Sequence, residues 1–409
     1  MAVGRMAAAI PGPGLTSASS ELLYLVQLGS SALVLNTNQQ LLASHRLWEY
    51  MSKRIPSLDG LRAVSIGCVL LGHLDGTRHC PQVPYLLTHF ANFGVRVFFV
   101  ISGYLITHLL LKEHGKSGRI NLGEFYRRRA FRILPPAYLY MGFIVLTGWH
   151  AFSRQNIVVA FAYITNYFIR STPWPLGHLW SLSVEEQFYL LWPFALAIAF
   201  ALRKKIALYT VLAAPVLRVA FYVAGWRDIG YYFPTVADAI ATGCLLAIVW
   251  PSLQRFDRYL LSPAASAAPV LACAIALLPE LGGPGLPNRI YYTLGLTVMH
   301  LCIAICIYNA VCKQWRWLNI KPMVWIGSIS YSLYLWQQPF LNRNDQIHWW
   351  AAFPQNIVLA FLFAAASYYL IEQPFLRLRD WRQHKKRAPE PAAGLRAPES
   401  RSSMPTQAA

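Results

Sequence analysis

The stretch DGLRAVSIGCVLLGH, residues 59–73, has the composition of a membrane-spanning helix, yet it carries two ionisable side chains, Arg62 and His73. At about 100° per residue, the step of eleven residues between them returns the helix to within about 20° of the same face. At a rise of about 1.5 Å per residue, they lie about 16 Å apart along the axis. Ionisable groups inside a bilayer are costly and tend to mark functional sites, so both are candidates for catalysis. Alternatively, Arg62 reaches a lipid head group while His73 only hydrogen-bonds a neighbouring helix.

The whole chain is apolar and basic. Of its 409 residues, 56% are hydrophobic and only 13% are charged, against roughly 25% charged in an average soluble domain. Apolar runs recur along most of the length, which indicates an all-α, polytopic membrane helical bundle. The basic residues behind the net charge of +19 lie between these runs, so we predict contact with anionic lipid head groups or a phosphorylated substrate, and no nucleic acid partner. The seven cysteines include no CxxC pair, and no metal site is predicted.

Clusters of Lys and Arg between the apolar runs predict how the chain crosses the membrane. Because such clusters mark cytoplasmic loops, counting crossings between them gives about ten transmembrane helices with both termini in the cytoplasm. Residues 155–182 are then predicted to stay outside, or to enter the membrane and return. The predicted spans are 60–76, 92–111, 136–150, 183–201, 206–224, 233–250, 265–280, 289–311, 323–340 and 354–375. This pattern predicts a multi-pass protein of the cell (inner, cytoplasmic) membrane.

The chain divides into three predicted parts. Residues 1–50 contain prolines in the first apolar stretch and no signal-peptide cleavage pattern, and we interpret them as an N-terminal extension or a misassigned translation start. Residues 51–376 form the predicted transmembrane domain. Residues 377–409 are rich in Arg, Lys, Pro, Ser and Ala without a periodic apolar face, so we predict a disordered basic cytoplasmic tail.

Two stretches place arginines at opposite ends of the predicted spans. In NFGVRVFFVISGYLI, residues 92–106, Arg96 lies on the same outer side as His73, while the SGY triplet favours close helix packing. In EFYRRRAFRILPP, residues 124–136, Tyr126 and four arginines precede a span on the cytoplasmic side. Arginine binds phosphates in bidentate fashion, but a juxtamembrane cluster is more typical of anionic lipid contact.

Two further stretches carry polar side chains into predicted spans. In GHLWSLSVEEQFYLLWP, residues 177–193, Ser181 or Ser183 is predicted to cap a helix whose first turn holds Glu185 and Glu186. Two carboxylates entering a span near a histidine exceed what a cap requires. In ISYSLYLWQQPF, residues 329–340, the polar side chains either bond across helices or line a cavity for a hydroxylated ligand.

Together, these stretches resemble the acyltransferase-3 family of integral-membrane O-acyltransferases, the O-antigen acetylase type. The resemblance covers about residues 54–376 and rests on Arg62-x10-His73 in LDGLRA…GH, GVRVFFVISGYLI, FYRRRAFRILP, HLWSLSVEEQFYLLWP and SYSLYLW. It implies a ten-helix core that transfers an acyl group, usually acetyl from acetyl-CoA, to a hydroxyl of a carbohydrate-type acceptor such as exopolysaccharide, lipopolysaccharide or a lipid-linked glycan. Where the family often reads YLWH, this chain has Gln337. Many members carry an SGNH-type esterase domain after the core. Only a short tail follows the core in this sequence, so we expect any second transfer step to need another protein.

The resemblance also implies roles for single residues. The helix-one histidine is catalytic in the family, which carries over to His73, and the arginine-rich loop handles the donor. We expect no permanently bound cofactor, with acyl-CoA as the donor co-substrate. The predicted donor-binding residues are Tyr126, Arg127, Arg128 and Arg132. The predicted acceptor-binding residues are Arg96, His178, Ser183, Tyr331, Trp336 and Gln337.

We therefore expect His73 to take the proton from the acceptor hydroxyl as it attacks the thioester. Glu185 is expected to orient His73 or to bind the acceptor, and Arg62 to hold the donor arm or to counter the developing oxyanion. An acyl-histidine intermediate is the alternative chemistry. A transporter or exporter is the rival class, since ten helices with polar residues and a basic cytoplasmic face also suit one. A third hypothesis is a degenerate member that only binds within a polysaccharide assembly complex.

Overall fold

The computed structural model describes residues 55–82, 84, 88–148, 152–281 and 285–387. Within these ranges the chain is helical and contains no β-strand, which confirms the all-α prediction. The predicted extension, residues 1–50, lies outside the described residues. The prediction of a disordered tail from residue 377 is wrong for its first part, because the last helix continues to Arg387.

The longer helices are α2 (Pro56–Leu74), α4 (Ala91–Ser117), α5 (Leu122–Thr147), α8 (Leu179–Ile198), α9 (Arg203–Val223), α10 (Phe233–Leu253), α12 (Ala267–Ala276), α14 (Leu296–Lys313), α15 (Lys321–Phe340), α16 (Gln355–Ser367) and α17 (Gln373–Arg387). Shorter helices are α6 (Arg154–Phe161), α7 (Trp174–Gly177), α11 (Asp257–Leu260) and α13 (Leu286–Ile290). Single turns of 3₁₀ helix are η2 (Thr165–Tyr167), η3 (Ile169–Ser171), η4 (Phe200–Leu202), η5 (Gln254–Phe256), η6 (Pro263–Ser266), η7 (Leu278–Leu281) and η9 (Trp349–Ala351). The π-helical turns η8 (Tyr291–Gly295) and η10 (Tyr368–Glu372) join α13 to α14 and α16 to α17.

Each of the ten predicted spans coincides with a helix. Among the described residues, eight helical segments are long and apolar enough to cross a membrane, so the chain is a multi-pass membrane protein. The two predicted spans that miss this standard are α8 and α15, each 20 residues long. Both carry serines and other polar side chains that point into the bundle. Polar side chains within a span tend to mark functional sites, so these two helices are the ones to search for a site.

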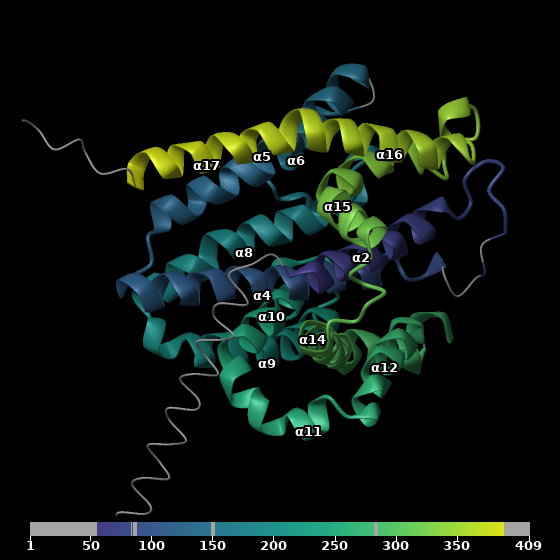
Figure 1. Ribbon diagram of the computed structural model, residues 1–409. Helices are drawn as coiled ribbons and strands as arrows, with labels where there is room; N and C mark the ends of the chain where they lie inside the picture. The colour runs from purple at the N-terminus through teal and green to yellow at the C-terminus, as the bar shows by residue number, and fades with distance from the viewer. Residues whose placement is uncertain (1–54, 83, 85–87, 149–151, 282–284, 388–409) are drawn as a thin grey trace, which may run out of the picture. The chain divides into compact units, whose positions relative to one another are not determined.

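Helix α2 lies between α4 and α15, and α4 packs against α10 (Figure 1). Close backbone contacts make this arrangement tight. A Cβ on Gly103 of α4 would lie 1.9 Å from the carbonyl oxygen of Ile240 in α10. A Cβ on Gly327 of α15 would lie 1.9 Å from the carbonyl oxygen of Asp59 in α2. Only glycine permits such approaches, which confirms the packing interpretation of the SGY triplet.

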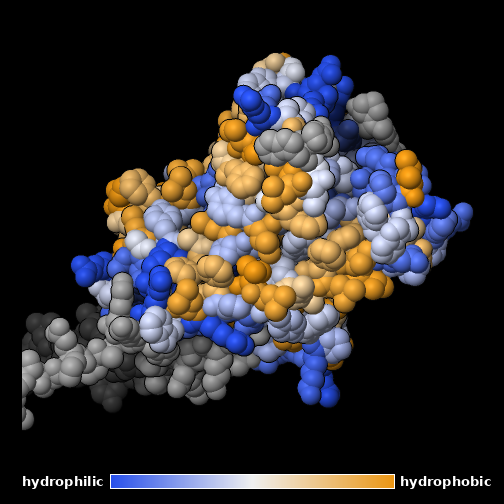
Figure 2. Space-filling model, turned by 90° about the horizontal axis from the view of Figure 1, so that it is seen from above, coloured by the Kyte–Doolittle hydropathy of each residue, from blue (hydrophilic) through white to orange (hydrophobic). Residues whose placement is uncertain are grey.

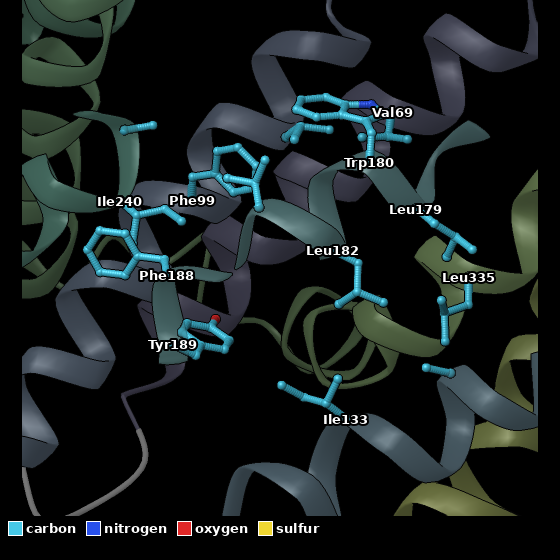
Figure 3. Close-up of a cluster of buried hydrophobic side chains, with 14 of the residues drawn as sticks. Val69, Phe99, Ile133, Leu179, Trp180, Leu182, Phe188, Tyr189, Ile240 and Leu335 are labelled. Atoms are coloured by element: carbon cyan, nitrogen blue, oxygen red, sulfur yellow. The ribbon is translucent and has the colours of Figure 1, made fainter. Parts of the chain in front are cut away.

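The first half of helix α8 is enclosed by the helices around it. Figure 3 shows five of its side chains meeting residues of α2, α4, α5, α10 and α15. The residues labelled there are Val69, Phe99, Ile133, Leu179, Trp180, Leu182, Phe188, Tyr189, Ile240 and Leu335. Lipid-facing positions include Ile198 at the end of α8, which is 70% exposed, and Val216 of α9, which is 67% exposed. Hydrophobic residues accordingly gather across the middle of the face in Figure 2, with hydrophilic residues at its margins.

The start of α8 differs from the prediction. The helix begins at Leu179, and its N-cap residue, His178, makes no side-chain cap. Ser183 donates to the carbonyl oxygen of Leu179 and accepts from the backbone N–H of Thr165. The predicted serine cap is therefore wrong, and Glu185 lies in the second turn rather than the first. The residue at which a helix starts depends on where the preceding loop enters the bundle. The spacing of the serines gave no information about that position.

Candidate active site

A cavity lies where α2 ends and α4 begins. It has a volume of about 670 Å³, within the range of small-molecule sites, and contains His73 and His178 in its wall. We call it the outer cavity, because the predicted topology places this end of α2 outside the cytoplasm. Its aromatic walls are formed by Trp174, Trp180, Tyr231, Tyr291, Tyr292 and Tyr334. Burial raises the pKa of the Tyr231 hydroxyl, so this group stays protonated and can exchange hydrogen bonds with a hydroxylated ligand.

His73 is held by contacts from two other elements. Its Nδ1 lies 2.9 Å from Oε1 of Gln337 in α15. The indole of Trp174 in α7 meets the imidazole edge-on, with ring centroids 5.3 Å apart. The second nitrogen, Nε2, has no hydrogen-bond partner among the described residues. The ring is therefore fixed on one side and open to the outer cavity on the other.

His178 is the second imidazole in the wall of this cavity. Its side chain is buried, and neither ring nitrogen has a hydrogen-bond partner in the part of the chain that the structure describes. Tyr140 and Tyr334 contact the ring, each with centroids 5.3 Å away. Buried polar groups in native proteins are normally paired, so an unpaired imidazole at a cavity suits direct contact with a ligand.

A second, narrower pocket lies deeper in the bundle and carries positive charge. It has a volume of about 90 Å³ and is lined by Arg62 of α2, by Arg129 and Arg132 of α5, and by Glu185 of α8. The Arg129 guanidinium stacks over Tyr189 at 4.8 Å from the ring centroid. We call this the inner pocket. Three guanidinium groups around one small space suit a phosphate-rich or anionic ligand.

The outer cavity and the inner pocket share two wall residues, Val95 and Tyr334. The Tyr334 hydroxyl donates to the carbonyl oxygen of His178 at 2.8 Å and lies 2.6 Å from the hydroxyl of Ser181. One layer of side chains thus separates the imidazoles from the arginines. The arrangement brings a proton acceptor and a cationic pocket back to back within the membrane bundle.

A family model described as an acyltransferase domain matches residues 55–372. The chain belongs to the acyltransferase-3 family. This finding confirms the resemblance drawn from the sequence motifs.

Curated members of the acyltransferase-3 family resemble this chain over most of its length. The O-acetyltransferase OatA of Staphylococcus aureus is 30% identical over 361 residues, covering 80% of this chain and 58% of that protein. The peptidoglycan O-acetyltransferase OatA of Listeria monocytogenes is 29% identical over 369 residues, covering 80% and 57%. The putative peptidoglycan O-acetyltransferase YrhL of Bacillus subtilis is 28% identical over 373 residues, covering 81% and 56%. The chain thus spans little more than half the length of these relatives. No solved structure matches it.

Glu185 does not contact His73 in this acyltransferase-3 fold. It lies in the inner pocket beside Ser102 and Tyr189, close to Arg62 and Arg129. The expectation that Glu185 orients His73 is therefore wrong, and Gln337 occupies that position. Sequence reasoning had placed Glu185 too near the outer surface because it started α8 too late.

The arginine-rich segment divides between the pocket and the surface. Arg132, one of the predicted donor-binding residues, lines the inner pocket. Arg127 pairs with Glu124 at 2.8 Å, and Arg128 pairs with Glu113 at 2.8 Å, so both lie outside the pocket wall. The Tyr126 hydroxyl donates to the carbonyl oxygen of Leu190, also away from the pocket.

The remaining predicted acceptor-binding residues have mixed positions. Arg96 is buried over the Phe99 and Trp180 rings, and its NH2 donates to the carbonyl oxygen of Gly230 at 2.8 Å. Tyr331 lines the inner pocket, with its hydroxyl bonded to the carbonyl oxygen of Ile133. Trp336 packs against Tyr140, Phe143 and Phe363 and lines neither cavity. Ser183 and Gln337 likewise contact protein groups rather than either cavity.

Several site residues were missed from the sequence. Arg129 could have been found, because it shares a helix face with the buried residues Phe125 and Ile133. Tyr334 and Gln338 belong to the polar stretch 329–340 but were not singled out within it, and Trp174 carries no such signal, because it approaches His73 from a distant segment. Among the described residues there is no cluster of His, Cys, Asp and Glu suited to a metal ion.

Proposed function

We propose that this protein is a membrane O-acetyltransferase that moves an acetyl group from acetyl-CoA to a hydroxyl of a glycan such as peptidoglycan. The observation that carries the proposal is the position of His73 in a cavity that adjoins an arginine-lined pocket. The names of the relatives, O-acetyltransferase and peptidoglycan O-acetyltransferase, support this reaction class. The topology favours the cytoplasmic membrane, with the donor arriving from inside and the acceptor from outside.

His73 acts as the general base on the acceptor side. Its Nε2 removes the proton from the acceptor hydroxyl while the oxygen attacks the thioester carbonyl. The tetrahedral intermediate then collapses, the carbon–sulfur bond breaks, and the imidazolium returns its proton to the CoA thiolate. Direct transfer of this kind needs the donor thioester to reach the wall between the cavities, where Tyr334 stands.

The inner pocket serves the donor. Arg62, Arg129 and Arg132 lie where the anionic, phosphate-bearing end or the thioester arm of acyl-CoA would enter from the cytoplasmic side. Arg127 and Arg128 remain candidates for phosphates at the entrance, although their ion pairs would have to open. Arg62 lies on the same helix as His73 but about 16 Å from it along the axis, so its place in the inner pocket suits holding the donor arm rather than the reacting thioester oxygen.

The outer cavity serves the acceptor. Aromatic faces such as Trp174 and Trp180 offer apolar surface, and the unpaired His178 imidazole offers a hydrogen bond to a sugar hydroxyl. Arg343 also lines this cavity, with its guanidinium 5.5 Å from the Trp174 ring centroid. This wall suits a carbohydrate better than a purely apolar ligand.

The test is acetyl transfer by the full chain in lipid nanodiscs. Labelled acetyl-CoA is supplied with peptidoglycan fragments, other glycans or no acceptor, and both labelled product and released CoA thiol are measured. His73→Ala should reduce transfer about 10²- to 10⁴-fold, the usual contribution of a general base. Ser332→Ala is the matched control, because Ser332 is buried in α15 and lines neither cavity.

Two results would overturn the proposal. One is undiminished transfer by a correctly folded His73→Ala protein, which would remove His73 from the chemistry. The other is a wild-type protein that neither labels any acceptor nor releases thiol, which would favour a transporter. Equal melting curves for the wild type and the variant establish that folding is unaffected.

A further inference from the structure

We infer that Gln337 is a positioning residue that holds His73 in one tautomer, with the proton on Nδ1 and the lone pair of Nε2 directed at the outer cavity. The inference rests on the proposed function of His73 as the base. It is carried by a chain of hydrogen bonds that runs from Trp174 through Gln338 and Gln337 to His73.

The direction of this chain is set by a backbone carbonyl. Nε2 of Gln338 lies 2.9 Å from the carbonyl oxygen of Trp174, which can only accept a hydrogen bond. The indole Nε1 of Trp174 donates in return to the carbonyl oxygen of Gln338 at 2.9 Å. The indole bond holds the Gln338 backbone beside Trp174, and the bond from Nε2 orients the side-chain amide, so its Oε1 faces Gln337.

The orientation of the Gln338 amide in turn sets the orientation of the Gln337 amide. Oε1 of Gln338 can only accept, and it lies 2.9 Å from Nε2 of Gln337, which also approaches the carbonyl oxygen of Tyr334 at 3.4 Å. The Gln337 amide therefore presents Oε1 to His73, 2.9 Å from Nδ1. Both glutamines are buried, so reversing either amide would leave unpaired polar atoms away from water, which is unfavourable.

The consequence is chemical. Because Gln337 Oε1 only accepts, Nδ1 of His73 must donate, and in the neutral imidazole Nε2 is then the acceptor. His73 lines the outer cavity, and its Nε2 has no hydrogen-bond partner among the described residues, which leaves this nitrogen for a ligand. An amide does not titrate, so this orientation persists across pH, whereas a carboxylate partner would stabilise the protonated imidazole.

The other charged groups around His73 come from several elements. His178 at the start of α8 and Arg343 after α15 face it most closely, and Tyr334 of α15 shares its cavity. Asp75 follows α2 in the same wall, and His89 and Glu280 lie further along it. Among the described residues, Gln337 is the only hydrogen-bond partner of His73 Nδ1.

The first test is direct. Nitrogen NMR of ¹⁵N-histidine-labelled full chain in nanodiscs, with His73→Gln used to assign the signal, should show pyrrole-like Nδ1 and pyridine-like Nε2. Gln337→Leu should mix the two tautomers, and Ser332→Ala should leave them unchanged. A pyridine-like Nδ1 in the wild type would overturn the inference, whatever the activity of the protein.

The second test uses the acetyl-transfer assay. Gln337→Leu should lower kcat roughly 10- to 100-fold, part of what the base contributes, with little change in KM for acetyl-CoA. Gln337→Glu should retain a partner for Nδ1 but shift the acidic limb of the pH–rate profile to higher pH. If wild type is active and His73→Ala is not, yet both Gln337 variants keep the wild-type kcat and profile, the positioning role is wrong and the proposed function stands. Full activity in His73→Ala would instead overturn the proposed function.

Discussion

His73 and His300 both lie within apolar helices, but His73 is half-buried beside a cavity whereas His300 is fully buried. His73 in α2 has one nitrogen on a neutral amide and lines a cavity of about 670 Å³. His300 in α14 lies 3.1 Å from the Asp238 carboxylate, which also pairs with the Arg218 guanidinium at 2.5 Å. All three side chains of this second group, the buried charge cluster, have no exposed surface and line neither the outer cavity nor the inner pocket.

The difference shows that an ionisable residue in a membrane helix is not sufficient evidence of a reactive site. In the buried charge cluster, opposite charges on α9, α10 and α14 compensate one another and join three helices. At His73 no carboxylate neutralises the ring, and a space for a ligand lies beside it. The compensated charges of the buried charge cluster suit a structural contact between helices. The neutral partner and the adjoining space at His73 suit a general base.

Removing the negative charge from the buried charge cluster should have the largest effect on stability. Asp238→Asn leaves the Arg218 guanidinium buried without its counter-charge, which should cost about 3–5 kcal/mol. The thermal midpoint, followed by size-exclusion chromatography after heating, should fall sharply. Acetyl transfer per folded molecule should fall far less. If Asp238→Asn kept the wild-type thermal midpoint but lost acetyl transfer, the buried charge cluster would have a catalytic role, and its contrast with His73 would be wrong.

The contact between α4 and α10 links the cavity walls to the buried charge cluster. Disrupting this contact should have the second-largest effect on stability. Gly103→Ala forces a methyl group to within 1.9 Å of the Ile240 carbonyl oxygen, so the helices must separate at a cost of about 1–3 kcal/mol. Gly67→Ala in α2 is the matched control, because nothing lies within 4 Å of the added atom. Equal midpoints for the two variants would contradict the close approach of α4 to α10.

Neighbouring arginines sharpen the comparison between paired and cavity-facing charges. Arg129→Gln should raise KM for acetyl-CoA about tenfold, equivalent to about 1.4 kcal/mol, because this guanidinium lines the inner pocket. Arg128→Gln should raise it less, because Arg128 is already engaged with Glu113 at 2.8 Å. Steady-state kinetics at saturating acceptor separates the two. A larger increase in KM for Arg128→Gln than for Arg129→Gln would indicate that the surface arginines, rather than the inner pocket, bind the donor phosphates.

The helices themselves were predictable because hydropathy is a local property. Ten apolar runs were located from sequence, and each is a helix, including α8 and α15 with their polar interiors. The family could be recognised for the same reason, since its motifs are short and contiguous. Boundaries were less predictable: α8 begins at Leu179, before the serines expected to cap it, and α17 continues into the expected tail.

The sequence by itself determined that this chain is a bundle of membrane helices, and it singled out one helix with Arg62 and His73 on a shared face. Only the tertiary structure decided which partners those residues have. His73 meets Gln337 across 264 positions of chain, and Glu185 lies with Arg62 in the inner pocket instead of with His73. The physical reason is that helix formation follows from nearby residues, whereas the rotation and depth of each helix follow from packing against segments distant in the chain.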